Sequence, residues 1–245
     1  MNLYGLIGYP LTHSFSKKYF TEKFAREGIT DSTYELFELP DLAEFPHLLA
    51  AHPNLRGLNV TIPHKKTIMP FLDALDESAR KVGAVNVIKL DNQGRTTGYN
   101  SDYYGFLLSL RHWLGNLSKP SALVLGNGGA CRAVTAALTD LGISYLVVSR
   151  QPTAETISYE QINAETIKNH PLIINTTPLG TYPAIETFPP IPYSFLTNHH
   201  FLYDLVYNPT ETQFMLKGAA AGASTHNGLA MLQLQAEKAW EIWSN

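Results

Sequence analysis

Cysteine is almost absent from this sequence, since Cys131 is the only one among 245 residues. A single thiol cannot form an intramolecular disulfide, which excludes the disulfide-stapled folds of secreted proteins and favours a reducing compartment. Long apolar runs are also absent, because no stretch approaches the roughly 18 apolar residues of a membrane-spanning helix. The first residues lack the basic segment followed by an apolar segment that marks an export signal. We therefore expect a soluble, cytoplasmic protein that does not associate with membranes.

Charged residues are scarce, at 16% of the sequence against a typical value of about 25%. The net charge is −3 and no block of like charges occurs, which excludes the basic surface of a nucleic-acid-binding protein. The histidines form no HxH or HExxH pattern and do not cluster with acidic residues or cysteine, so we expect no metal site. What the sequence has instead is a 44% share of apolar residues, which predicts a compact globular protein.

Short apolar strands alternate with helical segments along the chain, and the pattern changes near residue 102. Before that point, the sequence predicts strands at 3–7, 33–39 and 56–62, a hairpin of 85–90 and 95–99, and helices at 16–28, 41–50 and from Pro63 onward. After it, the sequence predicts strands at 122–125, 145–148, 171–175 and 201–206, with helices at 103–114, 130–141 and 227–243. Such alternation produces right-handed crossovers, so we expect an α/β fold of two domains, with a doubly wound parallel sheet in the second.

Glycines lie between the strand at 122–125 and the helix at 130–141, in the segment Gly126-Asn127-Gly128-Gly129. Glycine lets a backbone turn tightly and approach a pyrophosphate, and the N-terminus of the following helix offers free N–H groups to it. An ordinary glycine-rich turn is the alternative, but a strand before and a helix after are the context that a dinucleotide site requires. We interpret Cys131, at the next small position, as a packing residue.

The strand at 145–148 ends in Ser149-Arg150. An NAD-specific site usually has Asp or Glu at this position to accept bonds from the ribose 2′-hydroxyl. Arg150 could instead pair with a 2′-phosphate through its planar guanidinium group. The sequence therefore favours NADP, with a solvent-exposed strand-end arginine as the alternative.

Polar side chains gather at three places in the first 102 residues. Lys65 follows the strand at 56–62 in what should be the first turn of a helix, where the helix dipole disfavours a cation. Asp102 precedes the helix at 103–114, and Ser14 and Ser16 precede or begin the helix at 16–28. Taken singly, a surface lysine and ordinary helix caps explain these residues as well as catalysis does.

In combination, these segments resemble the shikimate dehydrogenase family over almost the whole chain. The segments that carry the resemblance are Gly8-Tyr9-Pro10 with His13-Ser14-Phe15-Ser16, Asn59–Lys65, Gly83–Asn86, Gly98–Asp102, Gly126–Val134, Asn175–Gly180, Asp204–Pro209 and Asn227–Gln235. The resemblance implies a substrate-binding domain of residues 1–102 and 228–245, to which the C-terminal helix returns. It also implies an inserted NADP-binding Rossmann domain of residues 103–227.

The resemblance also implies the reaction, which is the reversible, NADP-dependent reduction of 3-dehydroshikimate to shikimate in the biosynthesis of chorismate and the aromatic amino acids. Lys65 and Asp102 would be the catalytic pair, and either could carry the transferred proton. The substrate would be held by Ser14, Ser16, Thr61, Asn86, Tyr207 and Gln235. The cofactor would be held by Gly126, Gly128, Gly129, Ala130, Ser149, Arg150, Thr176 and Gly228.

Two other functions stay open at this stage. One is a quinate/shikimate dehydrogenase of relaxed specificity, and the other is a ligand-binding protein without catalysis on the same fold. The presence of both Lys65 and Asp102 argues against the second. The chain also departs from the family pattern, since Lys17 replaces a usual proline and Ser149-Arg150-Gln151 replaces Asn-Arg-Thr. We expect a monomer or a homodimer.

Overall fold

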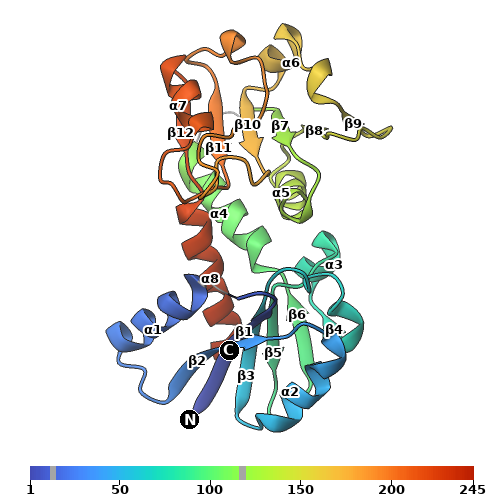
Figure 1. Ribbon diagram of the computed structural model, residues 1–245, viewed down its shortest axis with the longest axis vertical. Helices are drawn as coiled ribbons and strands as arrows, with labels where there is room; N and C mark the ends of the chain where they lie inside the picture. Colours follow the sequence, from blue (N-terminus) through green and yellow to red (C-terminus); the bar gives the residue numbers. More distant parts are fainter. Residues whose placement is uncertain (12–14, 116–119) are drawn as a thin grey trace. The chain divides into compact units, whose positions relative to one another are not determined.

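The computed structural model describes residues 1–11, 15–115 and 120–245, which fold into two compact units. The first unit contains residues 1–101 and 235–245, and the second contains residues 102–234. The chain passes between the units within two helices, α4 (Ser101–Leu114) and α8 (Leu229–Ser244) (Figure 1). The last part of the C-terminal helix thus belongs to the first unit, as predicted. None of the helices in these described segments is long and apolar enough to cross a membrane.

The first unit contains a mixed six-stranded sheet with the strand order β2-β1-β3-β5-β6-β4. The neighbours β2, β1 and β3 are parallel, whereas β5 and β6 form the predicted antiparallel hairpin. The strands are β1 (Asn2–Gly8), β2 (Ser32–Glu38), β3 (Leu55–Val60), β4 (Ala74–Leu75), β5 (Val87–Leu90) and β6 (Thr96–Tyr99). The helices that complete the unit with α8 are α1 (Phe15–Glu27), α2 (Phe45–Ala51) and α3 (Glu77–Val82), with 3₁₀ turns at Leu42–Glu44 and Met69–Phe71.

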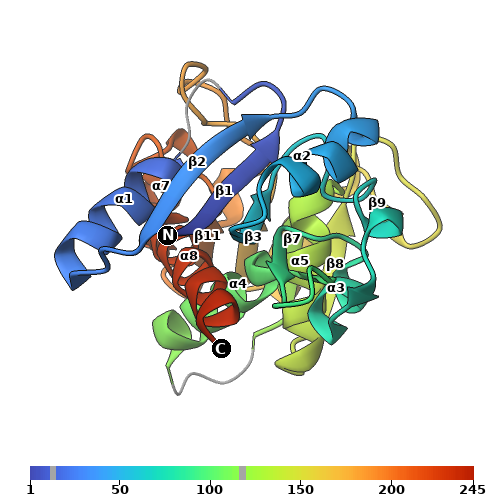
Figure 2. The ribbon, with the colours of Figure 1, turned by 90° about the horizontal axis from the view of Figure 1, so that it is seen from below.

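Alternation along β1 divides the first unit into two cores. Leu3 and Ile7 point to one face, where they pack in a cluster with residues of α2 and α3. Tyr4 and Leu6 point to the other face, where they pack in a cluster with residues of α1 and α8. Figure 2 shows α1 and α8 on one side of β1 and β2, with α2 on the other. Successive strand side chains alternate between faces, so one strand can serve both cores.

The second unit contains a parallel six-stranded sheet with the order β12-β11-β10-β7-β8-β9. Read from β9, this is the doubly wound order of dinucleotide-binding domains, and the winding reverses between β7 and β10. The strands are β7 (Ala122–Leu125), β8 (Tyr145–Val148), β9 (Thr156–Ile157), β10 (Leu172–Asn175), β11 (Phe201–Asp204) and β12 (Ser224–His226). The helices are α5 (Gly129–Asp140), α6 (Ala164–Asn169) and α7 (Gln213–Ala220), with 3₁₀ turns at Tyr159–Gln161 and Tyr193–Phe195. The predicted α/β fold class is thereby confirmed.

Three predicted details are wrong. No helix follows Pro63: residues 62–68 form turns, and the Lys65 carbonyl accepts a bond from Val85 N (2.7 Å) instead of joining a helical ladder. The segment 41–50 is not one regular α-helix, because its first turn, Leu42–Glu44, is 3₁₀ and runs directly into α2. Asp102 is not an N-cap, since α4 already begins at Ser101 and places Asp102 inside the first turn, where a carboxylate favours the helix dipole.

Candidate functional site

Asn86 is the centre of a buried polar cluster in the first unit, between α3 and β5. Its amide nitrogen donates to Ser101 Oγ (3.1 Å) and to Gln235 Oε1 (3.3 Å), and its amide oxygen accepts from Ser101 N (2.6 Å). Only 3% of Asn86 is exposed. Two residues predicted to hold the substrate, Asn86 and Gln235, are thus in contact although 149 positions separate them.

Lys65 is joined to this cluster by a hydrogen bond, and Asp102 by its position in the chain. Val85, whose N–H bonds the Lys65 carbonyl, directly precedes Asn86. Ser101, which is bonded to Asn86 twice, directly precedes Asp102. The Val85 backbone thus fixes the Lys65 backbone, and the Asn86 side chain fixes the residue before Asp102.

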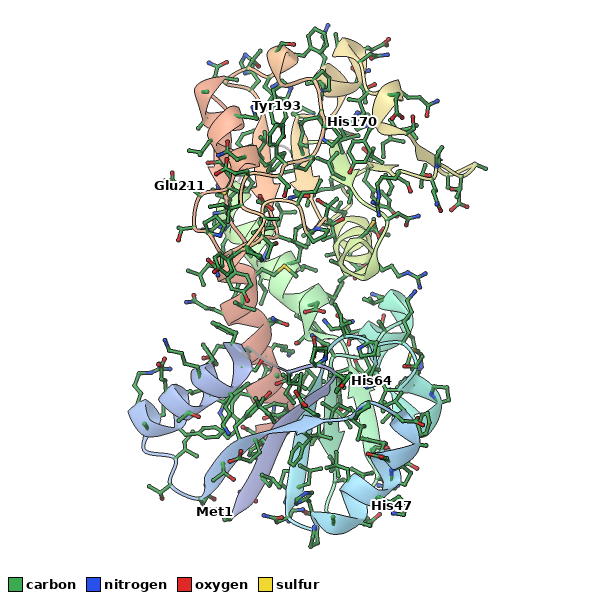
Figure 3. The ribbon with its side chains drawn as sticks, viewed as in Figure 1. Met1, His47, His64, His170, Tyr193 and Glu211 are labelled. Atoms are coloured by element: carbon green, nitrogen blue, oxygen red, sulfur yellow. The ribbon has the colours of Figure 1, made fainter. Side chains whose placement is uncertain are left out.

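His64 anchors the turn that carries Lys65. The His64 ring is buried and bonds the Leu39 carbonyl through Nε2 (2.5 Å). Figure 3 shows His64 at the end of the first unit's sheet opposite Met1, which is the end where β1 and β3 finish. His64 is therefore a buried structural neighbour of Lys65.

Ser16 and Thr61 lie at the same end of this sheet. Ser16 is the second residue of α1, and its side chain lies beside the Tyr34 hydroxyl. Burial holds the pKa of Tyr34 above its usual value, although the hydrogen bond with Ser16 lowers it in part. Thr61 directly follows β3, and its N–H donates to the Ile7 carbonyl (2.9 Å). Lys17, which departs from the family pattern, pairs with Glu35 (2.7 Å) at the surface. Ser14 lies outside the described residues.

A buried ion pair fixes α8, and with it Gln235, against α1. Lys23 is 4% exposed and bonds Glu237 (2.7 Å) and Glu27 (2.9 Å). Burial lowers the pKa of Lys23, but the bonds to Glu237 and Glu27 outweigh burial and hold the pKa above its usual value. Tyr19 also bonds Glu237. Two contacts from α1 thus hold a residue two positions after Gln235.

The glycine turn of the second unit lies where the winding of its sheet reverses. Gly126 directly follows β7 with φ +103°, a backbone conformation that favours glycine. A Cβ at Gly126 would also lie 2.9 Å from the Thr177 methyl group and 3.0 Å from Thr176 Oγ1. By contrast, no described atom lies within 4 Å of a Cβ added to Gly128 or Gly129.

This turn fits a pyrophosphate. α5 begins at Gly129, and Ala130 is its second residue, so the free N–H groups of its first turn are available to an anion. Open space where the glycine side chains would be is what close approach of a ligand to the backbone requires. The predicted strand–turn–helix context is confirmed.

At the end of β8, Ser149 and Arg150 have different roles. Ser149 Oγ donates to the Gln151 carbonyl (3.0 Å) and accepts from Gln151 N (3.2 Å), so its hydroxyl shapes the turn. Arg150 is exposed, and none of these three residues is acidic. The turn therefore presents a guanidinium group where an NAD-specific site would present a carboxylate.

The remaining predicted residues of this unit have internal partners or are exposed. Thr176 Oγ1 donates to the Leu125 carbonyl (2.8 Å), which ties the end of β10 to the end of β7 beside the glycine turn. A Cβ at Gly228 would lie 2.0 Å from the Leu205 carbonyl oxygen, so packing alone requires glycine there. Tyr207 is 41% exposed.

A buried carboxylate that sequence reasoning missed organises the loops after β10 and β11. Asp204 is fully buried and accepts bonds from Asn175 Nδ2 (2.9 Å), Val206 N (3.0 Å) and Thr212 Oγ1 (2.5 Å). Burial raises the pKa of Asp204 to about 6, although bonds from Thr212, Val206 and Asn175 lower it in part. The signals in the sequence were an acidic residue at the end of an apolar strand and its place at the start of Asp204–Pro209, one of the segments that carry the resemblance.

This raised pKa predicts a pH-dependent stability. The folded protein binds the proton of Asp204 more tightly than the unfolded chain, in which the pKa of an Asp is about 3.9. The contribution of Asp204 to stability is therefore largest below about pH 4 and is lost as pH rises through about 6. Asp204→Asn cannot titrate. We expect the unfolding free energy of the wild type minus that of the variant to fall by about 2–3 kcal/mol from pH 4 to pH 7 in urea titrations.

Asp91→Asn is the matched control. Bonds from Arg95 and Gln93 to Asp91 hold the pKa of its carboxyl below the usual value. Its contribution is therefore complete above about pH 4 and is lost only as pH falls further. A wild-type advantage over Asp204→Asn that stays constant from pH 4 to pH 7 would contradict the assignment.

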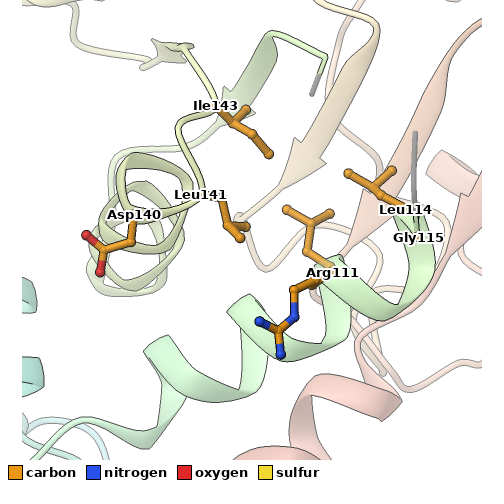
Figure 4. Close-up of a pocket in the computed structure, with 7 residues that line it drawn as sticks. Arg111, Leu114, Gly115, Asp140, Leu141 and Ile143 are labelled. Carbon is orange, nitrogen blue, oxygen red and sulfur yellow. The ribbon is translucent and has the colours of Figure 1, made fainter. Parts of the chain in front are cut away.

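A separate cavity of about 330 Å³ lies within the second unit, between the end of α4 and the end of α5 (Figure 4). It is lined by Leu110, Arg111, Leu114, Gly115, Asp140, Leu141 and Ile143. The helix α5 separates it from the glycine turn by about 18 Å, so it does not belong to the turn. Across the residues that the structure describes, no group of three or more His, Cys, Asp or Glu side chains could hold a metal ion.

Comparison with known proteins gives consistent matches over nearly the whole chain. A family model described as shikimate dehydrogenase substrate binding domain matches residues 6–88. A relative from Clostridium beijerinckii, named shikimate dehydrogenase (NADP(+)), is 40% identical over 258 residues, which cover 99% of this chain and 92% of the relative.

Two solved structures have the same architecture. The first is shikimate 5-dehydrogenase from Thermus thermophilus in complex with NADP(H) and shikimate, with a TM-score of 0.85 and 30% identity over 100% of this chain and 94% of that chain. The second is quinate dehydrogenase from Corynebacterium glutamicum in complex with NAD, with a TM-score of 0.85 and 28% identity over 99% of this chain and 93% of that chain.

Proposed function

The chain belongs to the shikimate dehydrogenase family, and we propose on this basis that it catalyses the reversible, NADP-dependent reduction of 3-dehydroshikimate to shikimate. The structural observation that carries the proposal is the cluster around Asn86. Val85, the residue before Asn86, donates its N–H to the Lys65 carbonyl, and Ser101, which bonds Asn86, directly precedes Asp102. The Asn86 amide also bonds Gln235. Relatives named for this reaction match at 35–40% identity over nearly the full chain. The reaction belongs to aromatic amino-acid biosynthesis.

In this proposal, residues 1–102 and 228–245 form the substrate-binding domain and residues 103–227 form the NADP-binding domain, which contributes Tyr207 to the substrate as well. In this assignment, the substrate carboxylate is held by the hydroxyl groups of Ser14, Ser16 and Tyr207. The ring hydroxyls are held by the Thr61 hydroxyl and by the amide groups of Asn86 and Gln235. Uncharged partners suit a polyhydroxylated ring, because each buried substrate hydroxyl must find a hydrogen-bond partner.

The chemistry requires one proton donor at the substrate oxygen. NADP, when bound, supplies or accepts the hydride at the ring carbon. Reduction leaves negative charge on the former carbonyl oxygen, and the Lys65 ammonium group can stabilise that charge and donate the proton. Asp102 can orient Lys65 and bind the same hydroxyl. Proton transfer by this pair proceeds in reverse when shikimate is oxidised.

The cofactor site uses the backbone of one turn and one side chain. Gly126, Gly128, Gly129 and Ala130 accommodate the pyrophosphate, because the turn leaves room for it and α5 offers its N-terminus. Arg150 binds the 2′-phosphate, and Ser149 holds the turn from which Arg150 projects. Thr176 and Gly228 lie along the cofactor in this assignment.

The second candidate function is that of an enzyme of relaxed specificity, which also accepts quinate. The observation that supports it is the similarity of this chain to the quinate dehydrogenase structure. Ser16 supports strict specificity, since relatives that accept quinate often have threonine there. We further propose a cytoplasmic monomer or homodimer.

The test is the initial rate of nicotinamide reduction by the purified protein with shikimate or quinate, each combined with NADP⁺ or NAD⁺. We expect the pair shikimate and NADP⁺ to give the highest kcat/KM. Comparable rates with quinate would establish the relaxed enzyme. Folded protein without a rate in any pairing would support the non-catalytic binding protein.

A further inference from the structure

We propose that Tyr34 is a positioning residue for the substrate, because its hydroxyl links Ser16 on α1 to Asn59 on β3 and through Asn59 to Asn86. This inference rests on the proposed function, in which Ser16 and Asn86 both contact the substrate. Sequence reasoning gave Tyr34 no role.

The contacts form a continuous chain within the first unit. Tyr34 Oη donates to Asn59 Oδ1 (2.7 Å), and Asn59 Nδ2 donates to the Asn86 carbonyl (3.3 Å). The Ser16 side chain lies against the Tyr34 hydroxyl at the other end. Tyr34 is 3% exposed, so its hydroxyl depends on these partners for its hydrogen bonds.

The direction of each bond is fixed by the main chain of Asn86. A carbonyl can only accept, so the amide nitrogen of Asn59 must face Asn86 and its amide oxygen must face Tyr34. The Tyr34 hydroxyl therefore donates its one hydrogen to Asn59, and its oxygen can only accept a hydrogen bond from Ser16. The same Asn86 carbonyl also accepts from Val60 N (2.9 Å), which ties Asn86 to the end of β3.

The ring of Tyr34 provides the rigidity that a positioning role needs. It stacks on Phe20 with ring centroids 4.8 Å apart and an interplanar angle of 14°. Phe20 lies one helical turn after Ser16 on α1. The stacked rings and the hydroxyl contact together orient α1, and with it Ser16, relative to the sheet that carries Asn86.

Tyr34→Phe keeps the stacked ring and removes only the hydroxyl. Asn59 Oδ1 then loses its donor and Ser16 its neighbour, which loosens two substrate contacts without touching Lys65 or Asp102. Such a loss weakens the binding of the substrate in its ground state and in the transition state by similar amounts, which raises KM and leaves kcat almost unchanged. We expect the KM for shikimate to rise on the order of tenfold, with kcat within about twofold and the KM for NADP⁺ unchanged.

Tyr203→Phe is the matched control, because Tyr203 is also buried and donates to Ser109 Oγ (2.8 Å), but in the second unit. It should leave the KM for shikimate unchanged. Asn59→Ala removes the same link from a half-buried position and provides a second variant if Tyr34→Phe does not fold. Both substitutions break the same series of contacts between Ser16 and Asn86. The KM for shikimate of the double variant should therefore be little higher than that of the more affected single variant.

The outcomes separate this inference from the proposed function. A normal wild-type rate with an unchanged KM for shikimate in Tyr34→Phe, or a kcat that falls as much as kcat/KM, overturns the positioning role alone. A wild type without a shikimate rate overturns the proposed function and this inference with it. A raised KM in Tyr34→Phe and Asn59→Ala, with Tyr203→Phe unchanged, supports the role.

Discussion

Lys65→Ala should lower kcat for shikimate oxidation about a thousandfold while changing the KM for shikimate far less. In our proposal, the Lys65 ammonium group meets charge that develops on the substrate oxygen only as the hydride moves. Its removal therefore acts on the transition state more than on binding. The turn that carries Lys65 is fixed by the His64 ring and by the bond from Val85, so alanine should leave the fold intact. Initial rates at saturating shikimate and NADP⁺ measure the effect.

Lys66→Ala is the appropriate control, because Lys66 is the next residue, carries the same charge and is exposed. We expect this variant to keep a kcat within about twofold of the wild type, since an exposed charge acts weakly in water. A Lys65→Ala enzyme that keeps more than about a tenth of the wild-type kcat would remove Lys65 from the catalytic role.

Arg150→Ala should separate the two nicotinamide cofactors. A guanidinium group that pairs with a 2′-phosphate forms charge-assisted bonds, so its loss should lower kcat/KM for NADP⁺ by about 10–100-fold. NAD⁺ has no 2′-phosphate, so its kcat/KM should change by less than about threefold. The assay is the rate of shikimate oxidation with each cofactor over a range of concentrations.

Lys168→Ala removes an exposed cation from α6 in the same unit and is the control for a general loss of positive charge. It should affect both cofactors equally and slightly. Equal large losses for NADP⁺ and NAD⁺ in Arg150→Ala would mean that the guanidinium group does not read the 2′-phosphate. The turn shaped by Ser149 would then not serve to place Arg150 at the 2′-phosphate.

The parts of the fold that could be predicted are those that local sequence specifies. β7 and β8 were predicted with their exact bounds, because short apolar runs between turn residues have few alternatives. The glycine turn after β7 was found for the same reason. The strand order could not be read from the sequence, since it depends on pairings such as β7 with β10.

The errors arose where tertiary contacts or short length override local signals. The turn after Pro63 looked like the start of a helix, but the bond from Val85 to the Lys65 carbonyl belongs to a residue 20 positions away. The two-residue strands β4 and β9 and the six-residue helices α3 and α6 were missed, because they are too short to show a period.

In the candidate site too, the sequence reveals local features but not the contacts between distant residues. Lys65 and Asp102 were visible as polar residues at the ends of strands, yet their pairing came only from the resemblance to a family. The contact between Asn86 and Gln235 and the bond between Tyr34 and Asn59 join distant residues, so no local pattern reveals them.

The most direct test of the account is to follow the hydride itself. The protein is incubated with 3-dehydroshikimate and with NADPH that carries deuterium on either face of the reactive nicotinamide carbon, and the product is examined by mass spectrometry. We expect shikimate one mass unit heavier from one of the two labelled cofactors and unlabelled shikimate from the other. If the folded protein forms no shikimate, or if neither labelled cofactor transfers deuterium to the product, the proposed dehydrogenase function is wrong.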